Sequence, residues 1–114
     1  MRVNYIRKDL QYLLHDNLKY ILHYTNKTIE DLANECGMSR VGLSQILKRC
    51  REEHNPGIGG CTFLGILHAA YILVEKSDIQ TEIYSVCIKK LNDVRNDYLE
   101  KGFYEQKGDI PDER

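Results

Sequence analysis

The sequence has few residues that interrupt helices, and it has no apolar run long enough to cross a membrane. Only two of its 114 residues are proline, Pro56 and Pro111, and strand-like alternation is rare. The longest strongly apolar stretch, 69 to 74, is far shorter than the ~20 residues of a transmembrane helix. The N-terminus is charged and has no signal-peptide core. We therefore expect a cytoplasmic, all-α protein with about five helices in one compact bundle.

The patterns that indicate metal sites or catalysis are also missing. The cysteines Cys36, Cys50, Cys61 and Cys87 stand 14, 11 and 26 positions apart, so there is no CxxC pair. Cys50, His54 and Cys61 could approach one another, but a zinc ion there would lack a fourth ligand. The histidines form no spaced set with carboxylates. We expect no catalytic residue, metal or cofactor, no enzyme activity, and reduced thiols with Cys36 and Cys87 buried.

Charge is divided unevenly along the chain, although the net charge is only −1. Residues 1–51 hold nine Lys or Arg and five Asp or Glu, whereas residues 52–114 hold seven and twelve. The basic half contains the cluster Arg40, Lys48, Arg49 and Arg51, which suits phosphates. The acidic half suits protein contacts. A solvated face of mixed charge is the alternative.

Residues 28 to 48, TIEDLANECGMSRVGLSQILK, predict two short helices joined by a tight turn. Thr28 can cap the first helix, with Asp31 three residues on as in a capping box. Gly37 accepts the left-handed conformation that ends a helix, and Ser39 can cap the second helix. The inward positions would be Leu32, Ala33, Cys36, Met38, Leu43, Ile46 and Leu47. The alternative is an ordinary helical hairpin inside a helical core.

Through these residues and their neighbours, the segment from 18 to 70 resembles the lambda-repressor-like family of DNA-binding domains, also called the Cro/repressor or XRE type. Its matching residues are Leu18, Ile21 and Leu22 in a first helix, the pair Leu32-Ala33, the turn Gly37-Met38-Ser39, then Leu43, Ser44 and Ile46, and finally Thr62, Phe63, Ile66, Ala69 and Ala70 in a fourth helix. The chain departs from the family at Ile29, which replaces a frequent Gln, at Leu47 and Arg49, and in its long loop 51–60.

The resemblance implies a sequence-specific DNA-binding transcriptional regulator, a repressor of phage or mobile-element type that reads the major groove with helix 39–48. Arg40, Val41 and Gln45 would face base edges, with chemistry suited to guanine, a thymine methyl and adenine. The residues implied to contact the DNA backbone are Thr28, Ser39, Ser44, Lys48 and Arg49. The expected partners are double-stranded DNA and a second copy of the chain. The alternative is a protein-interaction module, antitoxin-like or anti-repressor, that keeps the fold and acts through its acidic C-terminal half; Ile29 and the net negative charge favour it.

A long C-terminal helix is predicted over 78–103. Its apolar residues step by three and four, at Tyr84, Cys87, Leu91, Val94 and Tyr98. A helix of this length would run about 39 Å, longer than a compact core needs. The five residues are therefore predicted to form a homodimer interface, which would match two half-sites on DNA. The alternative is that they pack on the core of their own subunit.

The remaining segments complete one domain over residues 1–103. An apolar stripe from Asn4 to Tyr24 predicts a helix used for core packing. The glycine-rich linker from Arg51 to Gly60 precedes a helix that Thr62 is expected to cap, and it would either hold a phosphate or act as a flexible connection. Residues 104–114 are polar and are expected to form a fraying tail.

Overall fold

Five helices make up the part of the chain that the structure describes, residues 5–101. They are α1 (Lys8–Thr25), α2 (Ile29–Cys36), α3 (Arg40–Arg51), α4 (Gly60–Lys76) and α5 (Thr81–Lys101). This computed structural model contains no β-strand within residues 5–101, apart from one isolated bridge between Tyr5 and Gly59. The predicted all-α bundle of about five helices is confirmed. None of the described helices is long and apolar enough to span a membrane.

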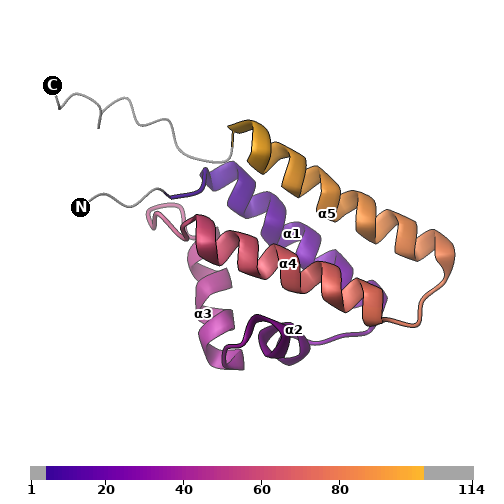
Figure 1. Cartoon of the computed structure of the whole chain (residues 1–114). Coiled ribbons are helices and arrows are strands. Elements are labelled where there is room, and N and C mark those ends of the chain that lie inside the picture. The colour runs from indigo at the N-terminus through magenta and orange to yellow at the C-terminus, as the bar shows by residue number, and fades with distance from the viewer. Residues whose placement is uncertain (1–4, 102–114) are drawn as a thin grey trace, which may run out of the picture.

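The three long helices α1, α4 and α5 lie side by side (Figure 1). On the side away from α5, α2 packs against α4, α3 packs against α1, and α2 and α3 contact each other. The core lies between them. Its fully buried members include Leu10, Leu14 and Ile21 of α1, Phe63, Ile66 and Val74 of α4, and Cys87, Leu91 and Val94 of α5. Burial of these apolar side chains is the main favourable contribution to folding.

The first helix begins at Lys8, later than the apolar stripe from residue 4 suggests. The backbone N–H of Ile6 donates to the carbonyl of Ile58 at 3.0 Å, and Tyr5 forms the bridge with Gly59. Residues 5 and 6 are therefore extended because they pair with the linker before α4. Within α1, the stripe packs into the core as expected.

The stripe on α5 lies within its own subunit. Cys87, Leu91 and Val94 are 0% exposed. Tyr84 is half-buried and its hydroxyl donates to Glu75 at 2.5 Å, while Tyr98 stacks on the Phe63 ring at 5.3 Å between centroids. With α5 packed in this way, the three buried residues cannot reach a second copy. The helix spans Thr81–Lys101, inside the predicted range of 78–103.

The linker 52–59 is held in place by the fully buried side chain of Gln11. Its Nε2 donates to the carbonyls of Ile6 at 2.7 Å and Pro56 at 2.9 Å. Gly57 stands beside this amide with φ +89°, a conformation that favours glycine. The linker thus has a defined tertiary contact with α1 at Pro56 and Gly57.

The start of α4 also differs from the expectation. Gly59, in extended conformation, is the N-cap, no side chain caps this helix, and Thr62 already lies in its first turn. The prediction of Thr62 as the cap is wrong because Gly59 is fixed as the boundary by its bridge to Tyr5.

Candidate nucleic-acid interface

The start of α2 has a complete capping box. The Thr28 hydroxyl oxygen accepts from the Asp31 backbone N–H at 3.1 Å, and the Asp31 carboxylate accepts from the Thr28 backbone N–H at 2.8 Å. The Thr28 hydroxyl also donates to this carboxylate at 3.1 Å. The hydrogen bonds from the Thr28 backbone and hydroxyl hold the pKa of Asp31 below its ordinary value of 3.8. Asp31 is therefore ionised at neutral pH, and the predicted capping box is confirmed.

Thr28→Ala is expected to lower the free energy of unfolding by about 1 kcal/mol, because it removes the N-cap hydroxyl. Since the folded-state pKa of Asp31 is depressed, the capping contribution of its charge is complete above pH 3.8 and is lost as pH falls through the folded-state value. Urea unfolding of wild type and variant at pH 6 and below pH 3 should show the difference narrowing in acid. Asn34→Ala, at an exposed position of the same helix, should not lower stability; an equal loss in both variants would contradict the capping argument.

The turn between α2 and α3 has the predicted geometry. Gly37 adopts φ +74°, and the N–H groups of Gly37 and Met38 donate to the carbonyls of Asn34 at 3.2 Å and Ala33 at 3.0 Å. Ser39 then caps α3, because its hydroxyl oxygen accepts from the Gly42 N–H at 3.0 Å. These local bonds fix the direction in which α3 leaves the turn.

The inward positions of the two helices pack as the motif predicts. Leu32, Ala33 and Leu43 are 0% exposed and Leu47 is buried. The half-buried residues Cys36, Met38 and Ile46 pack against the same core. Because these side chains hold α2 and α3 together, the opposite side of α3 has a fixed orientation.

The outward face of α3 consists of six exposed residues: Arg40, Val41, Ser44, Gln45, Lys48 and Arg49. At 100° per residue they cover an arc of about 180°, and they extend over about 14 Å of helix. Val41 is a large apolar residue that is nonetheless 60% exposed. All three predicted base-contacting residues and four of the five predicted backbone-contacting residues therefore lie at or beside one accessible face.

α3 has a strongly positive charge. Its twelve residues include Arg40, Lys48, Arg49 and Arg51 and no Asp or Glu. Arg51 pairs with Asp16 of α1 at 3.3 Å, whereas the other three make no ion pair with any residue of the described range 5–101. Cations near the C-terminus of a helix are stabilised by the helix dipole, but Arg40 stands at the opposite end, where that dipole opposes it. Its position is not explained by helix stability.

Thr28, the fifth predicted backbone-contacting residue, lies in a different environment. Its hydroxyl and its backbone N–H are both engaged with Asp31, and Glu30 adds a second acidic side chain to the first turn of α2. Two carboxylates would repel a phosphate at this helix start. Ile29 is half-buried and packs on the core, so its apolar side chain is explained by packing. The negative charge here opposes a role for Thr28 in phosphate binding.

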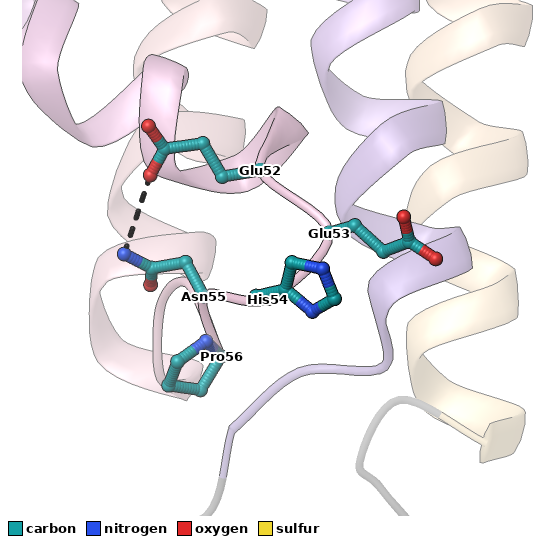
Figure 2. A pocket seen from close by; sticks show the side chains of 5 residues that line it. All are labelled: Glu52, Glu53, His54, Asn55 and Pro56. Atoms are coloured by element: carbon teal, nitrogen blue, oxygen red, sulfur yellow. Dashed lines mark hydrogen bonds between the residues drawn. The ribbon is translucent and has the colours of Figure 1, made fainter.

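The structure also contains an open depression in the linker, lined by Glu52, Glu53, His54, Asn55 and Pro56. Figure 2 shows that its side chains diverge: the Glu52 carboxylate accepts from the Asn55 amide at 3.4 Å, and Glu53 extends in the opposite direction. Within residues 5–101 no three His, Cys, Asp or Glu side chains gather as metal ligands. Cys50 is buried, which raises the pKa of its thiol to about 11, whereas Cys61 is exposed. The depression thus has no converging set of reactive groups.

Sequence reasoning missed three residues of α1 that lie against the end of α3. The Lys8 ammonium donates to the Arg49 carbonyl at 3.0 Å, Tyr12 lies beneath Arg51, and Asp16 pairs with Arg51. These contacts join residues about 35 to 41 positions apart. No local pattern in the sequence indicates such pairings.

No protein-family model, curated protein or solved structure matches this chain. The function of this chain is therefore inferred from its own residues and their arrangement.

Proposed function

We propose that this protein is a sequence-specific DNA-binding regulator that places α3 in the major groove. The observation that carries the proposal is the outward face of α3, with six exposed residues, no carboxylate and three cations that have no ion-pair partner in the described structure. A helix with its side chains is 10–12 Å wide, which matches a major groove of about 12 Å. The family resemblance of residues 18–70 adds a repressor role, exerted by occupying a promoter.

The side chains of this face supply complementary kinds of contact. Arg40 can donate two hydrogen bonds to guanine, Gln45 can pair with adenine, and Val41 can touch a thymine methyl. Ser39, Ser44, Lys48 and Arg49 flank them and suit the phosphates on either side. Two copies related by a two-fold axis would present two such helices to half-sites about 34 Å apart. We include this homodimer in the proposal.

A protein-interaction module is the second candidate. The observation in its favour is α5, which exposes Glu82, Asp93 and Glu100, with Asp93 paired to Lys89, and near its end exposes Leu99 by 70%. Such a module would use these residues of α5 and leave α3 without a ligand. Selection from a pool of random duplexes separates the two candidates, because only the DNA-binding regulator enriches a common sequence.

Arg40→Ala is expected to weaken binding to the selected duplex by about 1–3 kcal/mol, or roughly 5- to 150-fold, and to relax preference at one base pair. Fluorescence anisotropy measures the affinity, and titration at high concentration gives the stoichiometry, expected to be two chains per duplex. Arg95→Ala removes the same charge from an exposed site on α5 and should leave affinity unchanged. Enrichment of no duplex, or equal losses in the two variants, would refute DNA reading by α3.

A further inference from the structure

The junction of α1 and α3 holds two cations against one aromatic ring. The Lys8 ammonium lies 5.6 Å from the centroid of the Tyr12 ring, and the Arg51 guanidinium lies 4.9 Å from it. Lys8 also donates to the Arg49 backbone carbonyl at 3.0 Å, which ties the start of α1 to the last turn of α3. We call Lys8, Tyr12 and Arg51 the junction cluster.

The ring and the helix end hold these cations in place. The face of an aromatic ring attracts a cation electrostatically, so Tyr12 favours the observed positions of both charges. The Arg49 carbonyl belongs to the negative end of α3 and favours the ammonium of Lys8. Each contact orders a long side chain that would otherwise move freely in water. The cluster is thus arranged before any ligand arrives.

Nearby carboxylates neutralise the junction cluster only in part. Asp16 pairs with Arg51 at 3.3 Å, but this contact is exposed and therefore weak. The Glu52 carboxylate accepts from the Asn55 amide at 3.4 Å, and its negative charge also acts on Lys8, where it partly offsets the lowering of the Lys8 pKa by burial. Glu53 makes no ion pair with any residue in the described part of the chain. Like charges held this close repel each other, and a bound anion would relieve that repulsion.

The junction cluster continues the outward face of α3. On a helix of 100° per residue, Arg51 lies within about 40° of both Arg40 and Ser44, so the three form one flank of the helix. This row runs about 16 Å from Arg40 to Arg51 and then meets Lys8 of α1. A linear polyanion lying along α3 would reach the cluster without bending.

We propose that the junction cluster is a phosphate-binding site for the DNA backbone, in which Lys8 and Arg51 each hold a phosphate beyond the segment read by α3. The inference rests on the proposed function and adds a second binding element from α1. It also identifies a site for the backbone contact that the acidic start of α2 cannot provide. Asp16 competes with phosphate for Arg51 and limits the affinity.

The test is a salt titration of the full chain on a duplex from the selection, with Lys8→Gln, Arg51→Gln and Asp16→Asn. The slope of log affinity against log salt is negative, and each lost phosphate contact makes it shallower by about 0.9. We expect each Gln variant to bind roughly 5- to 10-fold more weakly near 0.1 M salt. Asp16→Asn should bind about 2- to 5-fold more tightly because it frees Arg51. Lys89→Gln removes the same charge from α5, which lies across the molecule from α3 (Figure 1), and should change nothing.

The outcomes separate the two proposals. If wild type binds no duplex, the proposed function fails and the junction cluster has no DNA to hold. If wild type binds with a steep salt slope and the slope is the same in Lys8→Gln and Arg51→Gln, only the phosphate site is overturned. Circular dichroism melting of each variant confirms folding, and Arg51→Lys, which keeps the charge, should restore most of the slope. If poly-glutamate competes as well as the duplex at equal charge, the site is a general anion site and the proposal fails.

Discussion

Gly57→Ala is expected to destabilise the protein by about 3 kcal/mol. The φ of +89° costs an alanine about 1–2 kcal/mol. The new methyl would lie 1.8 Å from Oε1 of Gln11, so the buried amide would have to move. Moving it breaks the bonds to the carbonyls of Ile6 and Pro56, and each buried group left without a partner costs about 1–3 kcal/mol. Urea unfolding measures the change.

Gly65→Ala is the matched control. Gly65 is exposed within α4, and a methyl added there would meet nothing within 4 Å. Alanine is a better helix former by about 1 kcal/mol, so this variant should gain stability. A loss in Gly65→Ala, or no loss in Gly57→Ala, would contradict the view that Gln11 and Gly57 lock the linker.

Val41→Glu is expected to reduce DNA affinity at least about 100-fold while leaving the fold intact. Val41 is 60% exposed at the start of α3 and contributes little to the core. A carboxylate there would stand between Arg40 and Gln45 on the face that we propose to enter the groove. Placing a carboxylate against the DNA phosphates costs several kcal/mol of binding free energy. A loss of about 2.7 kcal/mol already weakens affinity 100-fold. Anisotropy with the selected duplex measures the loss.

Val86→Glu makes the same exchange on α5, at a valine that is 40% exposed. The affinity of this variant should fall less than 3-fold, since general repulsion from one added charge is screened by salt. Thermal melting should give similar midpoints for both variants. Equal losses of affinity would show that total charge matters and that the face of α3 does not.

The turn and the caps of the helix-turn-helix could be predicted from the sequence because each depends on residues a few positions apart. Thr28 reaches Asp31, Ser39 reaches Gly42, and Gly37 needs only its own backbone freedom. The outward face of α3 could also be predicted from neighbouring residues, because the helical period of 3.6 residues decides which side chains lie opposite Leu43 and Leu47.

The start of α4 and the use of the α5 stripe depend on distant contacts. The heptad spacing of Cys87, Leu91 and Val94 is equally compatible with a second copy or with the chain's own α1 and α4. Gly59 becomes the N-cap of α4 because Tyr5 pairs with it from 54 positions away. Such pairings are set by the way the whole core closes, and no local pattern encodes them.

The sequence by itself therefore determined the helices, the turn and the residues that α3 exposes, because hydrogen bonds and periodicity within a few residues specify them. Only the tertiary structure decided that Gln11 locks the linker and that Lys8 and Tyr12 of α1 meet Arg51 of α3. These contacts exist because burial of the shared core brings α1 against the end of α3. That burial stabilises the protein only when the helices are assembled, so it cannot be assigned to any single segment of the sequence.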